Sequence, residues 1–178
     1  MRVVVTGTPG TGKTSAVEQL DTDLEVVHLN DLIESEGLWT ERDDERDSLV
    51  ADLDAVAERL EGKDGLLVES HLAHHLGADE DDAADEGVDK VIVLRCHPEE
   101  LQRRLTERGE PDAKAAENAE SEALDVILSE AVNTHGVENV YEIETTDRTP
   151  PEVAAEISAV VAGEREPSAG EVSYINYL

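Results

Sequence analysis

The stretch GTPGTGKT, residues 7–14, directly follows the apolar run VVV at residues 3–5. It is a complete G-x-x-x-x-G-K-[ST] phosphate-binding loop, and it lies between an expected first strand and an expected first helix. Gly10 and Gly12 allow the backbone to turn so that successive N–H groups point toward phosphate oxygens. Lys13 is expected to reach the β- and γ-phosphates, and the Thr14 hydroxyl is expected to ligate Mg²⁺. The stretch therefore predicts a protein that binds a nucleoside triphosphate.

Short β-branched runs alternate along the chain with helical segments. Strands are expected at residues 2–6, 25–29, 65–70, 90–95 and 139–144, and helices at 12–20, 30–36, 41–61, 98–108, 111–133 and 151–162. This alternation predicts an α/β protein with three layers, α/β/α, around a five-stranded parallel sheet. The phosphate loop is expected at the carboxyl edge of the first strand, as in P-loop NTPases.

A chain of 178 residues has room for one compact domain, which we expect over residues 1–162. The remaining residues, 163–178, form an expected C-terminal tail. It ends in Tyr174, Ile175, Tyr177 and Leu178, and an apolar end on so polar a protein should pack on something. Its own domain is the simpler candidate, and a partner protein is the alternative. The acidic run ADEDDAADEGVD at residues 78–89 is expected to be a solvated loop or helix.

The chain carries 44 acidic and 14 basic residues, a formal net charge of −30. An acidic tail, a disordered chain or a surface adapted to molar salt could each explain this excess. Carboxylates occur in nearly every segment, and periodic apolar runs are present, so the third explanation fits best. We therefore expect a halophilic protein. The acidity argues against direct, non-specific binding to nucleic acids.

One cysteine, Cys96, excludes a disulfide within the chain and is typical of a reducing compartment. No apolar stretch approaches the ~20 residues needed to cross a bilayer, and the first strand leaves no room for a signal peptide. The sequence predicts a soluble, cytoplasmic protein that does not bind membranes.

A second group of functional candidates follows the apolar run at residues 66–68. In P-loop enzymes an acidic residue at this place holds the Mg²⁺ water shell or positions a nucleophile, and Glu69 fits it. His71 lies two residues on, on the same side of an extended chain. The alternative is an ordinary strand-end carboxylate and a helix cap, and the nearby phosphate loop favours the functional interpretation. His71, His74 and His75 also suggest a metal site, but without a third committed ligand a cap or surface role is preferred.

Arginines are scarce on this chain, so their clustering is informative. Arg103, Arg104 and Arg108 share one expected helix, with Arg104 and Arg108 one turn apart. Arg95 ends a strand at the same edge of the sheet as the phosphate loop. Guanidinium groups that converge on a triphosphate would stabilise the charge that develops during phosphoryl transfer. The alternative is surface ion pairing, which suits Arg103 with Glu99 or Glu100.

The segment HLNDLIESEGLWTERDDERD, residues 28–47, occupies the place that carries the phosphate acceptor in small kinases. Asp31, Arg42 and Arg46 are candidate contacts. Trp39 is a candidate base-stacking or lid residue, although a buried structural tryptophan is the simpler interpretation.

Together these blocks resemble the archaeal and eukaryotic adenylate kinase isoenzyme 6 family over about residues 1–160. The resemblance is carried by TGTPGTGKT, VVHLNDLI, DLDAVAERLEG, GLLVESHL, VIVLRCHPEELQRRLTERG and KAAENAESEALDVILSEA. It implies a nucleoside monophosphate kinase-like fold with a monophosphate-binding segment at about 30–61 and a short lid at about 108–118. It also implies an enzyme that uses ATP, Mg²⁺ and AMP or dAMP, with weak ATPase activity. The family further implies a role in small ribosomal subunit maturation, through a basic ribosomal protein of the platform.

The resemblance assigns roles by position. The phosphate-binding group comprises Gly10, Gly12, Lys13, Thr14 and Ser15. Arg108 resembles the lid arginine, and Lys114 and Asn118 fall in the lid stretch. Glu69 and His71 match the family's Asp-x-His strand end, with a glutamate in place of the aspartate. Residues 146–148, including Arg148, resemble the loop that packs against adenine. The expected catalytic residues are Lys13, His71, Arg104 and Arg108, and the expected Mg²⁺ ligands are Thr14 and Glu69.

Three functions remain open from the sequence. The first is transfer of the ATP γ-phosphoryl group to AMP. The second is an assembly switch in which ATP hydrolysis, with His71 positioning water, drives a change in a ribosomal partner. The third is a small-metabolite kinase of similar fold, such as a shikimate- or dephospho-coenzyme-A-type enzyme.

Overall fold

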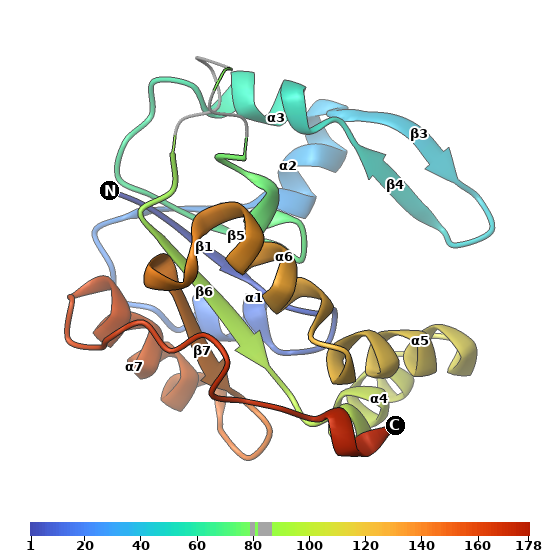
Figure 1. Ribbon diagram of the computed structural model, residues 1–178. Helices are drawn as coiled ribbons and strands as arrows, with labels where there is room; N and C mark the ends of the chain where they lie inside the picture. The colour runs from blue at the N-terminus through green and yellow to red at the C-terminus, as the bar shows by residue number, and fades with distance from the viewer. Residues whose placement is uncertain (79–80, 82–86) are drawn as a thin grey trace.

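A parallel five-stranded sheet forms the centre of the computed structural model, which describes residues 1–78, 81 and 87–178. Its strands follow the order β2-β5-β1-β6-β7, and every neighbouring pair is parallel (Figure 1). They are β1 Arg2–Thr6, β2 Glu25–His28, β5 Leu66–Glu69, β6 Lys90–Arg95 and β7 Val140–Glu144. The five strands expected from the sequence are confirmed, each within one residue at either end.

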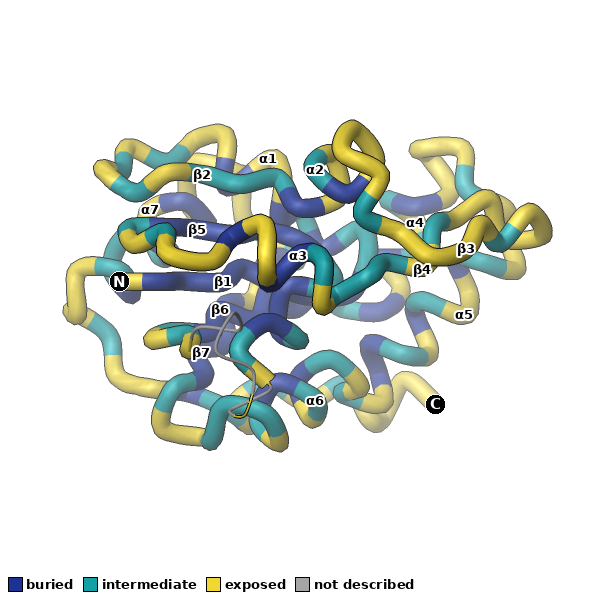
Figure 2. The backbone as a smooth tube through the Cα atoms, turned by 90° about the horizontal axis from the view of Figure 1, so that it is seen from above, coloured by how far each residue is buried: buried dark blue, intermediate teal, exposed yellow. Residues whose placement is uncertain are grey.

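Helices cover both faces of this sheet, and β1 shows why. Val4 belongs to a core shared with α2 (Leu29–Glu36), α3 (Leu53–Leu60) and α6 (Val126–His135). Val3 and Val5 belong to a second core shared with α1 (Lys13–Val17) and α7 (Pro150–Val161). Alternate residues of a strand point to opposite faces, so the three consecutive valines of β1 can serve both cores. In Figure 2, β1, β5 and β6 form a dark-blue buried layer between the helices, whereas the edge strand β2 is mostly teal.

Helices α4 (Pro98–Glu107) and α5 (Asp112–Ala123) pack on each other beyond the carboxyl end of the sheet (Figure 1). A small core of Cys96, Leu101, Leu105 and Ala115 holds them together. The turn between them contains Gly109, which has a φ of 90°. The α4–α5 pair lies beside the phosphate loop, which follows the end of β1.

The prediction of a single helix at residues 41–61 is wrong for the first half of that stretch. Residues 39–51 form an antiparallel hairpin of β3 (Trp39–Asp43) and β4 (Ser48–Ala51), which projects from the body (Figure 1). The Asp43 carboxylate accepts hydrogen bonds from the backbone N–H groups of residues 45 and 46, which stabilises a turn instead of a helix. Asp52 then caps α3 by accepting from Ala55 N at 3.1 Å.

The single helix expected at residues 111–133 is two helices, α5 and α6. The helix is interrupted at Asp125, whose left-handed φ of 55° ends α5 and precedes the start of α6. Arg95 accounts for the break because its Nη2 donates to the Glu122 carbonyl oxygen at 3.2 Å and to Asp125 Oδ1 at 2.5 Å. A buried guanidinium thus binds the end of α5 and holds the chain in a turn at this point.

Arg95 does not converge on a triphosphate, so that prediction is wrong. Its side chain is 1% exposed and also donates to Glu122 Oε1 at 2.8 Å and to Glu142 Oε1 at 2.6 Å. These carboxylates raise the pKa of Arg95, against the opposing effect of burial. Arg95 is the centre of a buried ion cluster that joins β6, β7 and α5.

The C-terminal tail packs on the body of the same chain. Ser168 N donates to the Val140 carbonyl oxygen at 3.0 Å, and the Glu142 carboxylate accepts from the N–H groups of residues 171 and 172. Farther on, the Tyr174 ring lies 5.5 Å from the Arg95 guanidinium. Ile175 remains 54% exposed, so the end of the tail is only partly covered.

Within the described residues, no helix is long and apolar enough to span a bilayer. Most of the acidic run at residues 78–89 lies outside the described residues.

Candidate active site

The phosphate loop joins β1 to α1 in the left-handed conformations that its glycines permit. Gly7, Gly10 and Gly12 have φ values of 145°, 92° and 94°. A Cβ on Gly7 would lie 2.6 Å from the Leu94 carbonyl oxygen, and one on Gly10 would lie 2.9 Å from the Leu105 side chain. Any other residue here would push the loop away from β6 or α4, so the glycines fix where the loop sits.

Lys13 folds back over the loop. Its Nζ donates to the carbonyl oxygens of Gly7 at 2.8 Å and Thr8 at 3.1 Å. Burial lowers the pKa of Lys13 to about 8, although the Glu69 and Glu122 carboxylates oppose this shift. The side chain is therefore still mainly protonated at pH 7 and held by acceptors that phosphate oxygens can replace.

Thr8, inside the loop, is anchored by a residue of α5. Its hydroxyl donates to Glu122 Oε2 at 2.6 Å, and the same carboxylate pairs with Arg95. The buried ion cluster thus reaches the phosphate loop through α5. Glu122 was not a sequence candidate, since nothing in its local pattern marks a residue that contacts a loop so far along the chain.

Thr14 and Glu69, the two expected Mg²⁺ ligands, are in contact. Thr14 Oγ1 donates to Glu69 Oε1 at 3.0 Å, and His28 Nδ1 lies 2.8 Å from the same oxygen. Glu69 is buried because parallel pairing of β5 with β1 and β2 places its strand end under the loop. His28 is a contact that sequence reasoning missed, although its register opposite Glu69 in β2 explains it.

His71 lies in the same cavity, lined by Lys13, Thr14, Glu69 and Arg108. Burial, together with the charge of Lys13, lowers the pKa of His71 to about 4, so its ring is neutral at pH 7. Asn30, from the start of α2, also lines this cavity and accepts a 2.7 Å hydrogen bond from the Ser70 hydroxyl. The structure therefore brings together residues of the loop, β5, α2 and the end of α4.

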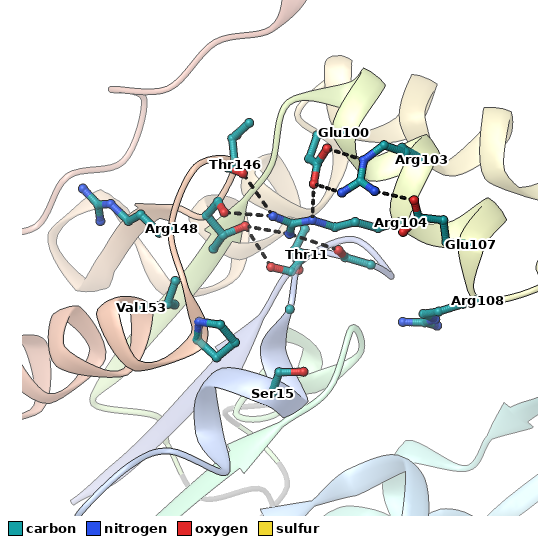
Figure 3. A pocket seen from close by; sticks show the side chains of 14 residues that line it. Thr11, Ser15, Glu100, Arg103, Arg104, Glu107, Arg108, Thr146, Arg148 and Val153 are labelled. Carbon is teal, nitrogen blue, oxygen red and sulfur yellow. Dashed lines mark hydrogen bonds and ion pairs between the residues drawn. The ribbon is translucent and has the colours of Figure 1, made fainter.

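The three arginines of the α4 region have three different environments (Figure 3). Arg103 pairs with Glu100 and Glu107 on the surface, the alternative that the sequence left open for it. Arg104 donates to the carbonyl oxygens of Thr145 and Thr146 at 3.0 and 3.2 Å, which ties α4 to the loop after β7. Arg108 is 60% exposed, with a Glu110 oxygen 3.9 Å from its Nη2.

A larger cavity, of about 570 Å³, opens beside the phosphate loop. Gly10, Gly12, Ser15 and Arg108 line it together with Thr146, Arg148 and Val153. In Figure 3, Arg108 and Arg148 stand on opposite sides of the Arg104 group. The volume of this cavity lies within the roughly 300–1,000 Å³ that is usual for small-molecule sites.

A third cavity, of about 630 Å³, lies between the hairpin tip and α5. Arg46 and Asp47 line it from the tip, and Arg108, Lys114 and Asn118 line it from the other side. Arg46 Nη1 lies 3.5 Å from Glu117, which connects the two sides. Arg42 instead pairs with Asp47 on the tip, and Asp31 is exposed in the first turn of α2. Trp39 is 40% exposed, so the interpretation of a buried tryptophan is wrong.

The parallel strand order, the phosphate loop at the end of β1 and the lysine, threonine and glutamate beside it define a P-loop nucleotide-binding protein of the kinase type. The chain is 60% identical over 178 residues to a protein of Natronomonas pharaonis named "Putative adenylate kinase", and 57% identical to one of the same name from Halobacterium salinarum, with all of each chain covered. This chain belongs to their family. Residues 3–125 also match the AAA domain family.

Solved structures agree with the fold. A shikimate kinase from Bacteroides thetaiotaomicron has a TM-score of 0.52 at 20% identity, over 92% of this chain and 98% of that one. A gluconokinase from Sinorhizobium meliloti has a TM-score of 0.51 at 19% identity, over 91% of both chains. A sulfotransferase from Alicyclobacillus acidocaldarius reaches 0.54 at 15% identity, over 98% and 87%. At these low identities the similarity shows a shared fold and nothing about function.

Proposed function

We propose that this protein is an adenylate kinase that transfers the γ-phosphoryl group of ATP to AMP or dAMP, with Mg²⁺. The observation that carries the proposal is the position of Arg108, which lines both cavities at the phosphate loop and also the cavity between the hairpin tip and α5. A phosphoryl group passing between two nucleotides needs a cation where donor and acceptor meet. Arg108 is exposed enough to turn toward either side.

The donor phosphates belong in the cavity of Lys13, Thr14 and Glu69. Mg²⁺ takes octahedral oxygen ligands at about 2.1 Å, which separates neighbouring ligand oxygens by about 3 Å. The 3.0 Å between Thr14 Oγ1 and Glu69 Oε1 fits two such neighbours. When bound, Mg²⁺ would offset the charge of the phosphates. Lys13 would exchange its loop carbonyls for phosphate oxygens, and Gly10, Gly12 and Ser15 would surround the same group.

The two nucleosides then take the two larger cavities. The cavity at Thr146, Arg148 and Val153 suits the donor adenosine, because an apolar wall and hydrogen-bonding groups lie together there. The cavity between the hairpin tip and α5 suits the acceptor, whose phosphate would meet Arg46, Arg108 and Lys114. This assignment gives the segment at 30–61 and the stretch at 108–118 their roles as monophosphate-binding segment and lid.

The test is an acceptor screen in about 2–3 M KCl, where screening suits so acidic a surface. ADP formation from ATP should require AMP or dAMP, and shikimate or dephospho-coenzyme A should not replace them. Consumption of ATP at the same rate with and without AMP would contradict the proposal and favour an ATP-driven switch.

A weak ATPase activity and a role in small-subunit maturation complete the proposal. The net charge of −30 would attract a basic ribosomal protein, and Ile175 and Leu178 offer an exposed apolar contact at the end of the tail. Binding of a basic platform protein should weaken as KCl rises, because attraction between opposite charges is screened.

Substitution of His71 should affect ATP hydrolysis and phosphoryl transfer to AMP to different extents. This histidine lines the cavity beside Lys13 and Glu69, where it can orient a water molecule at the phosphate. Exchange for asparagine should lower ATP hydrolysis by about 10²-fold or more and lower AMP-dependent ADP formation much less. Both rates are measured on the same preparation. An equal loss of the two rates would show that His71 positions the phosphates and not the water.

A further inference from the structure

Three side chains from two distant parts of the sequence meet behind the phosphate loop. His74 and His75 lie on the short helix η1 (Ala73–His75), and Glu130 lies on α6. One ligand atom from each falls within 4.8 Å of the others. His74 Nε2 is 2.8 Å and His75 Nε2 is 4.0 Å from the same carboxylate oxygen, Glu130 Oε2. Two imidazoles and a carboxylate are a donor set that transition metals favour.

The spacing of these atoms suits a tetrahedral ion. Zn²⁺ binds imidazole nitrogen and carboxylate oxygen at about 2.0–2.2 Å, so neighbouring ligand atoms lie about 3.4 Å apart. The distances of 2.8 and 4.0 Å stand on either side of that value. Glu130 is 44% exposed, so its carboxylate has freedom to turn and make the two distances equal.

Neighbouring residues hold the His74 side chain in place, whereas His75 and Glu130 are partly exposed to solvent. His74 is 1% exposed, and its Nδ1 lies 2.9 Å from Thr6 Oγ1 while its Nε2 faces Glu130. The backbone carbonyl oxygen of His74 also accepts a hydrogen bond from His135 Nε2 at 2.8 Å. Metal-binding histidines usually have the second nitrogen fixed in this way. His75 is 35% exposed, so an ion can enter from solvent and keep a water as fourth ligand.

We propose that His74, His75 and Glu130 bind one divalent transition-metal ion of the Zn²⁺ class, separate in its residues from the Mg²⁺ pair Thr14 and Glu69. With the ion on Nε2, His74 carries its proton on Nδ1 and donates to Thr6 Oγ1. The ion ties η1 to α6, and Thr6, next to Gly7, connects it to the start of the phosphate loop.

Calorimetric titration of the full chain with ZnCl₂, in molar KCl and excess MgCl₂, tests the proposal. Mg²⁺ prefers oxygen ligands and occupies the carboxylate sites, whereas imidazoles retain Zn²⁺. The wild type should bind one Zn²⁺ per chain. His75→Gln and Glu130→Gln should each weaken binding by at least about 10-fold, and Thr6→Val by about 10–100-fold. Glu120→Gln, a matched change at an exposed position of α5, should bind as the wild type does.

Co²⁺ gives a second readout, since four-coordinate Co²⁺ absorbs strongly in the visible range. The wild type and Glu120→Gln should show these bands, and His75→Gln and Glu130→Gln should lose them. His75 and Glu130 are partly exposed, so both variants should melt at the wild-type temperature without metal. The proposal is overturned if no saturation occurs near one equivalent, or if His75→Gln and Glu130→Gln bind Zn²⁺ as tightly as Glu120→Gln does.

Discussion

Replacing Lys13 with alanine is expected to reduce AMP-dependent ADP formation by at least about 10²–10³-fold. The ammonium group is the one cation of the phosphate loop itself, and it is already poised there by the carbonyl oxygens of Gly7 and Thr8. Charge develops on the transferred phosphoryl group, and a buried cation stabilises that charge far better than water does. The measurement is the coupled rate of ADP formation with saturating AMP.

The matched control is Lys63→Ala, which removes a partly exposed lysine that pairs loosely with Glu25 at 3.8 Å. It should keep the wild-type rate. Thermal unfolding of both variants distinguishes lost chemistry from a lost fold. If folded Lys13→Ala retained more than about a tenth of the activity, Lys13 would not act at the transferred phosphate.

Replacing Arg95 with leucine is expected to lower the free energy of unfolding by about 3–5 kcal/mol. The substitution leaves Glu122 and Glu142 buried without their cation and removes the donor to the Glu122 carbonyl oxygen. Losing one partner of a buried ion cluster costs more than the cluster itself contributes, because the remaining charges stay out of water. Urea unfolding at fixed, molar KCl measures the change without altering ionic strength.

Arg103→Leu is the matched control on the surface of α4. The ion pairs of Arg103 are exposed to solvent, so removing this side chain should change the free energy of unfolding little. Because Glu122 also accepts from the Thr8 hydroxyl, Arg95→Leu should weaken ATP binding as well. Equal stability of the two variants would mean that water reaches the buried carboxylates or that they are protonated.

The elements that the sequence placed correctly are those with a local signal. Each strand of the main sheet is a short apolar run between turns, and its limits are confirmed within a residue. The helix prediction at residues 41–61 failed because the apolar spacing from Leu49 to Leu60 was extended backward through ERDDERD, residues 41–47. Asp43 and Asp52 have side chains that bond to the backbone, and they form a turn and a helix cap instead.

The arginines show where local reasoning stops. Arg95, Arg103, Arg104 and Arg108 were all candidates for a triphosphate, but their environments differ. Arg95 lies in a buried ion cluster and Arg103 in surface ion pairs, whereas Arg104 binds the loop after β7 and Arg108 lines the cavity of Lys13. Their type was informative because basic residues are scarce on this chain. Arg103 keeps its partners within its own helix, three and four residues away. The partners of Arg95 and the carbonyl acceptors of Arg104 lie on β7, α5 and the loop after β7, and no spacing within residues 95–108 encodes those contacts.

The sequence by itself located the phosphate loop, the five strands of the main sheet and the placement of Thr14 and Glu69 at one edge of it. Loop geometry follows from closely spaced glycines, and parallel strands bring their carboxyl ends to one edge. Only the tertiary structure decided that His28 shares the Glu69 oxygen, that Glu122 anchors the loop, and that Glu130 supplies a third ligand beside His74 and His75. The His28 contact depends on the pairing of β2 with β5, and the other two arise where α5 packs beside the phosphate loop and α6 packs beside η1. All three therefore depend on the whole fold and on no single stretch of chain.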